Sequence, residues 1–188
     1  PSSLAIWRRA KCAKCRPRCS GNSWAGRRPR APVRVTGGKH RGRRIEAGPG
    51  REVRPTAIRA RQALFNILAH SPALLAEPPL PADARVVDVF AGTGALGFEA
   101  LSRGARHATF IDNDAAALRL IERNAAHLDE AERVSLLRRD ATAPGRAPAP
   151  CALAFLDPPY GSGLAVPALA ALEREGWFLP GALAVVEL

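Results

Sequence analysis

The chain has 188 residues, enough for one ordinary domain with a modest extension, and 47% of them are hydrophobic, enough for a real core. Its apolar runs are far shorter than the roughly 20 residues of a membrane span, and the first residues lack the apolar segment of a secretory signal. The sequence therefore predicts a cytoplasmic protein without membrane contact. Because it contains no Met and begins with Pro, we expect a fragment or a processed form.

Charge divides the chain into a basic part and a mildly acidic part. Residues 1–62 contain 18 Lys and Arg against 2 Asp and Glu, whereas residues 63–188 contain 10 against 15. This asymmetry is typical of a protein that binds a polyanion with one part and performs chemistry with the other. The alternative is a solvated basic tail. We expect such a disordered extension for residues 1–31, which show no hydrophobic period.

The four cysteines are too few and too unevenly placed for a disulfide scaffold. Cys12, Cys15 and Cys19 cluster, but structural zinc needs four ligands and only the distant His40 could complete the set. We therefore expect no metal site. Cys151 is most simply a small, buried, apolar residue in a strand.

Residues 33–70 are expected to form a basic β-hairpin followed by a helix. Val33–Thr36 alternates as a strand does, Gly37 and Gly38 supply a turn, and Lys39–Ile45 returns as the second strand. Thr56 fits the N-cap of a helix with apolar residues at helical spacing. Basic residues that we expect to contact RNA phosphates are Arg41, Arg43, Arg44 and, on the helix, Arg59. Arg61 falls at the helical spacing of the apolar residues. For Arg59 and Arg61 we expect contact with RNA or cofactor, and the alternative is a solvated helix face.

After a proline-rich linker, residues 84–97 read ARVVDVFAGTGALG. An apolar run typical of a buried parallel strand is followed by Gly92, Gly94 and Gly97, spaced G-x-G-x-x-G, and then by a helix-forming run. This is the opening of a nucleotide-binding βαβ unit. The pattern alone would serve NAD, FAD or S-adenosylmethionine, or a turn without ligand. Asp88 favours S-adenosylmethionine, because its carboxylate could meet the ammonium of the methionine part.

Strands alternate with helices through the rest of the chain. We expect strands at 85–90, 107–111, 134–138, 152–156 and 183–187, and helices at 96–102, 115–128 and 166–175. This alternation predicts an α/β fold with a doubly wound, mostly parallel sheet over residues 84–188.

Acidic residues stand at the ends of four of these strands: Asp88, Asp112, Asp140 and Asp157. Ligands of a doubly wound sheet lie beyond the carboxyl ends of its strands. Asp112 follows Gly92 by 20 residues, the spacing at which an acid reaches ribose hydroxyls. It could instead cap the next helix, but Asp114 fits that role better. For Asp140, a local cap and a contact with an adenine amino group remain equal alternatives.

Asp157-Pro158-Pro159-Tyr160 is the sharper signal. Two prolines stiffen the backbone and remove two N–H donors, leaving carbonyl groups as acceptors. A carboxylate and a carbonyl that accept both N–H bonds of a nucleobase amino group can aim its lone pair at a methyl sulfonium. The ring of Tyr160 would stack on an extruded base. The alternative is a plain proline turn.

Four segments together, RVTGGKHRGRRI, RPT…R.R..LFN.L, DVFAGTGALGFEALSRGA and DPPY, resemble the bacterial 16S ribosomal RNA guanine-N2 methyltransferases of the RsmD family. The resemblance covers Val33 to Leu188. It implies a Rossmann-like methyltransferase sheet and methyl transfer from S-adenosylmethionine to the exocyclic N2 of a guanine in a small-subunit RNA loop. It also implies ribosomal RNA or the 30S particle as partner, and we expect a monomer.

The resemblance further implies roles for individual residues. Cofactor binding is implied for Asp88, Phe90, Ala91, Gly92, Thr93, Gly94, Asp112, Asp140 and Ala141. Catalytic contacts with the target base are implied for Asp157, Pro158 and Tyr160. Arg54 and Thr56 would border the pocket and contact substrate RNA. Ile58 departs from the polar residue expected after RPT. The family's sheet has two further strands, so we expect this sheet to be truncated after its fifth strand.

Three other functions remain as alternatives. An NAD-dependent oxidoreductase shares the glycine turn but predicts neither DPPY nor a basic N-terminal part. A DNA amino-methyltransferase shares DPPY but normally brings a target-recognition domain, which this sequence lacks. A non-enzymatic RNA-binding protein would not need an intact DPPY.

Overall fold

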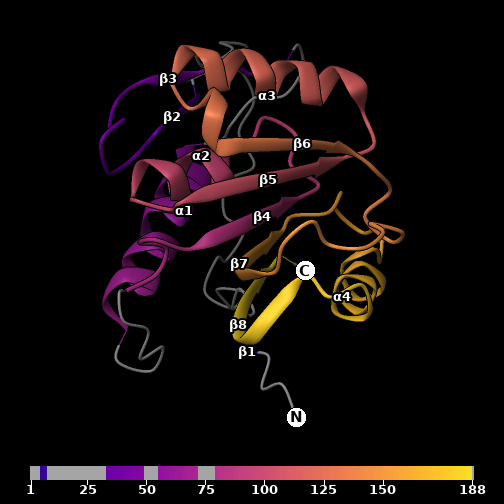
Figure 1. Ribbon diagram of the computed structural model, residues 1–188. Helices are drawn as coiled ribbons and strands as arrows, with labels where there is room; N and C mark the ends of the chain where they lie inside the picture. The colour runs from indigo at the N-terminus through magenta and orange to yellow at the C-terminus, as the bar shows by residue number, and fades with distance from the viewer. Residues whose placement is uncertain (1–4, 8–32, 49–54, 72–78, 188) are drawn as a thin grey trace, which may run out of the picture.

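The computed structural model describes residues 5–7, 33–48, 55–71 and 79–187, which build an α/β sandwich around one sheet (Figure 1). The sheet has the order β1-β8-β7-β4-β5-β6, and each neighbouring pair is parallel. Its strands are β1 (Ala5–Trp7), β4 (Arg85–Val89), β5 (His107–Asp112), β6 (Val134–Arg138), β7 (Cys151–Leu156) and β8 (Phe178–Val186). The predicted doubly wound, mostly parallel fold is confirmed.

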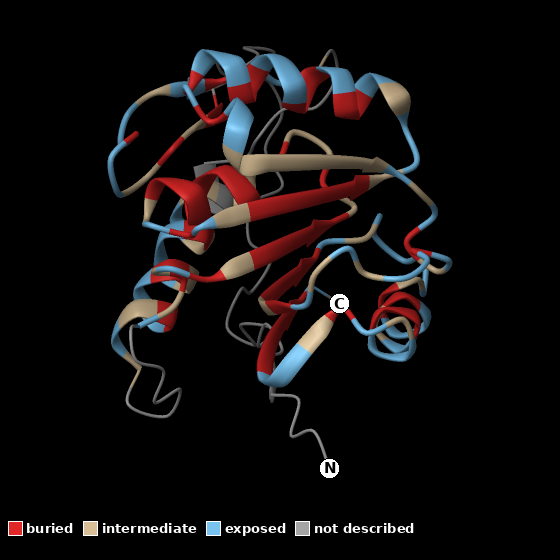
Figure 2. Cartoon of the chain, viewed as in Figure 1, coloured by how far each residue is buried: buried red, intermediate tan, exposed pale blue. Residues whose placement is uncertain are grey.

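Helices cover both faces of the sheet, because adjacent residues of each strand point to opposite sides. On one face, Val86 and Phe110 pack with α1 (Pro55–His70), α2 (Ala95–Ser102) and α3 (Ala115–His127). On the other face, Val87 and Val89 pack with α4 (Ala165–Arg174) and Trp177. Figure 2 shows the central strands buried between these layers. A short 3₁₀ helix, η2 (Ala131–Arg133), precedes β6.

The order of the strands creates a crevice between β4 and β7. From β4 the chain winds outward through β5 and β6, then returns to the other side of β4 for β7 and β8. The connections therefore leave in opposite directions at β4 and β7. Ligands of open α/β sheets bind at such a reversal, beyond the carboxyl ends of the strands.

The basic hairpin forms, but its paired strands are shorter than expected. β2 (Val33–Arg34) and β3 (Arg44–Ile45) pair antiparallel over two residues each. The expected strands Val33–Thr36 and Lys39–Ile45 were too long, because the backbone N–H of Thr36 donates to Glu99 and that of Lys39 to Ser102 instead of to the opposite strand. The connecting loop thus docks on α2.

Two other expectations are corrected. The helix α1 begins at Pro55, so Thr56 is inside the helix and is not its N-cap. Proline suits the first helical position, because its missing N–H has no intrahelical partner there. Within the expected disordered extension, Ala5–Trp7 forms the edge strand β1, paired with Leu183–Val185; three consecutive apolar residues suit such pairing. The rest of residues 1–31, including the clustered cysteines, lies outside the described residues.

Close packing at Gly97 gives a first prediction. A Cβ built there would lie 2.3 Å from Cε1 of Phe110, a buried ring of β5. Gly97→Ala should therefore lower the free energy of unfolding by about 1–3 kcal/mol through overpacking. Gly48→Ala is the matched control, because its Cβ would meet only Leu120 Cδ2 at 3.8 Å. Denaturant unfolding of both variants checks this; equal stabilities would contradict it.

Candidate active site

A cavity of about 550 Å³ lies at the carboxyl ends of β4, β5, β6 and β7. The cavity is lined by the ends of these strands and the segments that follow them, and by Leu164 before α4. The lining includes most of the predicted cofactor residues, namely Asp88, Phe90, Ala91, Gly92, Thr93, Asp112, Asp140 and Ala141. Two of the predicted catalytic residues, Asp157 and Pro158, line it as well. The structure thus brings together residues that are far apart in the sequence.

The glycine turn after β4 is held by its own backbone and by two carboxylates. Phe90, Gly92 and Gly94 adopt positive φ values of 62°, 56° and 74°, and the N–H of Gly94 donates to the carbonyl of Ala91. Glycine adopts this region without steric cost. Phe90 shows the same conformation in a non-glycine residue, which is uncommon and typical of functional sites. The turn is therefore a strained structure that other contacts must stabilise.

Asp88 supplies one of those contacts. Its Oδ2 accepts the N–H of Gly97 at 2.8 Å, in the first turn of α2. Burial raises the pKa of Asp88 to about 8; the Gly97 hydrogen bond opposes this rise, and the charges of Asp157 and Asp112 add to it. The sequence indicated Asp88 as a ligand contact but not this structural bond to α2.

Asp112 supplies the other contact. Its Oδ2 accepts the N–H of Gly92 at 2.8 Å, and its Oδ1 accepts the N–H of Asp114. The side chain of Asp114 in turn caps α3 by accepting the N–H of Ala116, as the sequence predicted. Asp112 thereby ties the end of β5 to the glycine turn at the cavity wall.

Asp140 makes local contacts at the end of β6. Its Oδ1 accepts both the N–H and the hydroxyl of Thr142, and these two bonds lower the pKa of Asp140. This is the local-cap alternative, although the residue still lines the cavity. Its neighbour Arg139, which the sequence did not single out, also lines the cavity and donates to the carbonyl groups of Pro144 and Arg146.

The charges around the cavity select the type of ligand. Arg139 is the single basic residue among the described residues of the lining. Five aspartates line the cavity: Asp88, Asp112, Asp114, Asp140 and Asp157. Even with Asp88 protonated up to about pH 8, such a lining attracts a cation and repels the pyrophosphate of a dinucleotide. It fits S-adenosylmethionine, which carries a sulfonium and an ammonium, better than NAD or FAD.

The DPPY segment lies at the mouth of the cavity. The N–H of Asp157 donates to the carbonyl of Val89 at 3.5 Å, so β7 and β4 end side by side. Asp157, Pro158 and Pro159 line the cavity, whereas Tyr160 does not and its residue surface is 99% exposed. The structure therefore places the carboxylate and prolines together and leaves the tyrosine ring outside them.

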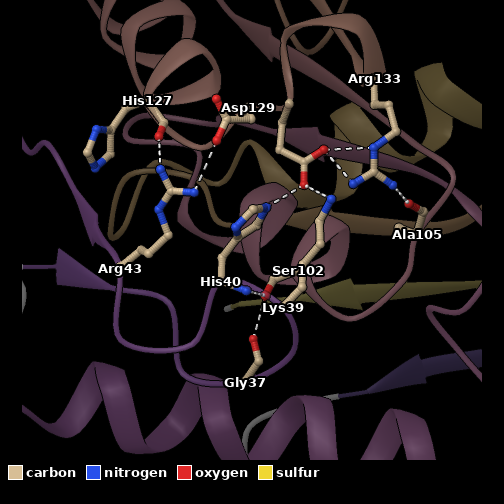
Figure 3. A network of polar contacts seen from close by, with 10 residues as sticks. Gly37, Lys39, His40, Arg43, Ser102, Ala105, His127, Asp129 and Arg133 are labelled. Atoms are coloured by element: carbon tan, nitrogen blue, oxygen red, sulfur yellow. Dashed lines mark hydrogen bonds and ion pairs between the residues drawn. The ribbon is translucent and has the colours of Figure 1, made fainter.

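The predicted RNA contacts divide into two groups. Arg41, Arg44 and Arg59 are exposed. Arg43 instead contacts the body: it donates to Asp129 Oδ2 at 3.4 Å and to the carbonyl of His127 (Figure 3). Arg54 and the side chain of Thr56 lie outside the described residues.

Two buried carboxylates attach the hairpin loop to the body. Glu130 contacts Lys39 Nζ at 2.8 Å and His40 Nε2 at 2.6 Å, and it also accepts from Arg133 Nε at 2.7 Å (Figure 3). Burial alone would raise the pKa of Glu130, but the bonds from Lys39, Arg133 and His40 hold it below its ordinary value. Glu99 accepts both the N–H and the hydroxyl of Thr36.

Glu99 also holds α1 against α2. Its side chain contacts Arg61 Nε at 3.4 Å and Arg103 Nε at 2.9 Å. Arg61 is buried, not solvated as the simple helix-face alternative would have it, and burial lowers its pKa although Glu99 opposes the shift. Sequence spacing placed Arg61 on the apolar face of the helix but could not identify its carboxylate partner.

Comparison with known proteins agrees with this geometry. Residues 33–188 match the family described as "Conserved hypothetical protein 95". The chain is 36% identical to the ribosomal RNA small subunit methyltransferase D of Escherichia coli strain K12, over 82% of this chain and 74% of that protein. It is 34% identical to the Bacillus subtilis protein named putative rRNA methyltransferase YlbH, over 68% of this chain and 67% of that protein.

A solved structure supports the same comparison. The putative methyltransferase yhhF from Escherichia coli has a TM-score of 0.66 at 36% identity, covering 79% of this chain and 76% of that one. The expectation of a Rossmann-like methyltransferase fold is thereby confirmed. Within the part of the chain that the structure describes, no helix is long and apolar enough to cross a membrane.

The raised pKa of Asp88 gives a prediction about stability and pH. The folded chain retains a proton on Asp88 up to about pH 8, whereas the unfolded chain releases it near the ordinary value of 3.8. The stabilising contribution of Asp88 to the free energy of unfolding is therefore fully present below pH 3.8 and is lost as the pH rises through 8. Asp88→Asn should lose less stability than the native chain between pH 5 and pH 8.5, as measured by urea unfolding. Parallel pH curves for the two proteins would contradict the shifted pKa.

Proposed function

We propose a specific reaction for this chain, which is a methyltransferase and belongs to the family of the ribosomal RNA small subunit methyltransferases D. It transfers the methyl group of S-adenosylmethionine to the exocyclic N2 of a guanine in small-subunit ribosomal RNA. The observation that carries this proposal is the position of Asp157 and Pro158 at an acidic cavity whose wall includes the turn at Gly92. A loop guanine suits the site, because a base there can be splayed out without melting a helix.

The residues of the cavity would hold the cofactor by charge and by close backbone approach. Asp88 and Asp157 would face its cationic groups, the turn from Phe90 to Gly94 would lie along it, and Asp112 would accept from its ribose hydroxyls. Asp140 and Ala141 would border its adenine. The cofactor supplies an electrophilic methyl group, which needs no acid, base or metal to leave the sulfur.

Nucleophilicity at the guanine amino group is the remaining chemical problem, because its lone pair is delocalised into the ring. The carboxylate of Asp157 and the carbonyl of Pro158 would accept its two N–H bonds and turn the lone pair toward the methyl group. S-adenosylmethionine would supply the methyl group to this nitrogen, and the Asp157 carboxylate would accept the proton that the amino group releases. The exposed ring of Tyr160 would stack on the extruded base.

The exposed arginines of the hairpin would bind the RNA around the target base. Arg41, Arg44 and Arg59 would offer cations to phosphates. The family resemblance adds Arg54 and Thr56 to the residues that would contact the RNA. The partner would be the ribosomal RNA or the 30S particle, bound by one monomer in the cytoplasm, where bacterial ribosomes are assembled.

A transfer assay with labelled S-adenosylmethionine tests the function. Unmodified small ribosomal subunits, naked small-subunit RNA and duplex DNA are offered in parallel, and the labelled nucleoside is identified after digestion. We expect N2-methylguanosine at one position of the RNA. Label in DNA, or at another atom of the base, would overturn the proposal.

Asp157 should matter for turnover more than for cofactor affinity. Asp157→Ala removes an acceptor that acts as the methyl group moves, so the turnover number should fall on the order of 100-fold or more. Asp83→Ala is a matched control, since Asp83 is exposed and pairs with Arg106 instead. Single-turnover kinetics and calorimetry with the cofactor measure the two effects; near-normal turnover in Asp157→Ala would exclude the mechanism.

The salt dependence of RNA affinity should distinguish the exposed arginines of the hairpin from an exposed arginine elsewhere. Arg41→Ala and Arg44→Ala should each weaken RNA binding and reduce the slope of log affinity against log salt by about 1, through loss of one phosphate contact. Arg174→Ala, at an exposed residue of α4 paired with Glu175, is the control. Filter binding at several salt concentrations checks this. Slopes that match the control for both variants would remove the hairpin from the RNA interface.

A further inference from the structure

Asn124 is a buried polar residue of α3 that no step above requires. It has no exposed surface, and all of its hydrogen-bonding groups point to backbone atoms of other segments. A buried carboxamide is costly to leave unpaired, so such a residue needs partners at each group. These partners belong to two different parts of the site.

The first partner is the residue that follows the hairpin. Asn124 Oδ1 accepts the N–H of Glu46 at 2.8 Å, and Nδ2 donates to the carbonyl of the same residue at 3.1 Å. The carboxamide thus pairs with Glu46 as another peptide group would. Glu46 comes directly after β3, so this pair of bonds fixes the end of the hairpin that carries Arg44.

The second partner is the glycine turn of the cavity. Asn124 Nδ2 also donates to the carbonyl of Thr93 at 3.4 Å, a longer bond than the other two. Thr93 lies between Gly92 and Gly94 and lines the cavity. One side chain therefore joins the hairpin to the wall of the cofactor site, 31 residues earlier in the chain.

The side chain of Glu46 takes no part in this junction. It forms an ion pair with Arg123 Nε at 3.1 Å, and both side chains are more than half exposed, at 60% and 58%. An exposed ion pair of this kind contributes little. The buried amide junction and the exposed ion pair can therefore be disrupted separately.

We propose that Asn124 is a positioning residue that holds the RNA-binding hairpin at a fixed place relative to the cofactor turn. This inference rests on the RNA-binding role given to the hairpin under Proposed function. Phosphates bound at Arg44 would then determine where the target base enters the cavity, and Thr93 is part of the cavity wall that would hold the cofactor. A misplacement of about 1 Å between reacting groups can lower a rate on the order of 100-fold.

Two variants disrupt the junction from opposite sides. Asn124→Asp keeps the shape of the side chain and its acceptor oxygen. It replaces the Nδ2 donor, which faces the carbonyl groups of Glu46 and Thr93, with a second carboxylate oxygen. Glu46→Pro removes the N–H donated to Asn124, and its exposed position after an extended strand suits proline. Glu46→Ala and Arg123→Ala are the controls, because they remove only the ion pair.

The junction variants should lower catalysis with the RNA but leave the affinity for S-adenosylmethionine nearly unchanged. Asn124→Asp and Glu46→Pro should lower kcat/KM for the RNA by about 10- to 100-fold, while S-adenosylmethionine affinity stays within about threefold. Cofactor affinity should persist because Asp112 and Asp88 still hold the glycine turn and α2. Glu46→Ala and Arg123→Ala should resemble the native chain.

A double-mutant cycle separates positioning from general stability. Arg44→Ala should cost less in the Asn124→Asp or Glu46→Pro background than in the native chain, because a displaced hairpin no longer delivers its phosphate contact. The proposal is overturned if the effects of Arg44→Ala and of the junction variants on kcat/KM simply multiply. It is also overturned if only cofactor affinity falls, or if Glu46→Pro and Glu46→Ala have equal kinetics. If Arg44→Ala alone changes nothing, the RNA role of the hairpin fails; a kinetic difference between Glu46→Pro and Glu46→Ala then still supports the junction.

Discussion

The carboxylate of Asp88 lies buried at the end of β4 and accepts the backbone N–H of Gly97 from the first turn of α2. This bond links the central strand of the sheet to the helix that follows the glycine turn. Burying a carboxylate in this way is costly, as its raised pKa shows, and Asp112 and Asp157 make it more so. A positive ligand in the cavity would favour the ionised form of Asp88, so the side chain that supports the fold also favours a cationic ligand.

The hairpin is built into the body, and close packing at two glycines shows why. A Cβ at Gly38 would lie 1.8 Å from the carbonyl oxygen of Ser102, and one at Gly37 would lie 2.3 Å from Arg103 Nη2. Only glycine permits the approach at Gly38, where the contact is with backbone and φ is +74°, whereas at Gly37 the contact is the mobile end of an arginine side chain. Glu99, Ser102 and Glu130 then satisfy the polar groups of the loop. The exposed Arg41 and Arg44 are thereby presented from a segment that is fixed to the body.

Opposite charges are kept apart in this arrangement. The cavity is lined by aspartates and suits a small cation, whereas the exposed arginines suit a polyanion. Phosphates are repelled from the cavity itself, so only an uncharged base should enter it. The exposed Tyr160 lies just after Pro158 and Pro159, two residues of the cavity lining.

The sequence alone was sufficient for the alternating strands and helices from Arg85 onward, the glycine turn, the aspartates at the strand ends and the DPPY segment, but not for the edge strand β1. Each of these depends on short-range periodicity or on a motif of a few residues. It did not determine that Arg43 and Arg61 are used inside the protein, nor that Asn124 joins two parts of the site. Those roles depend on contacts between residues far apart, such as Thr36 with Glu99 at 63 residues' separation and His40 with Glu130 at 90. A single sequence records no pairing at such distances, because the identity of a polar partner is decided only when the layers pack together and exclude water.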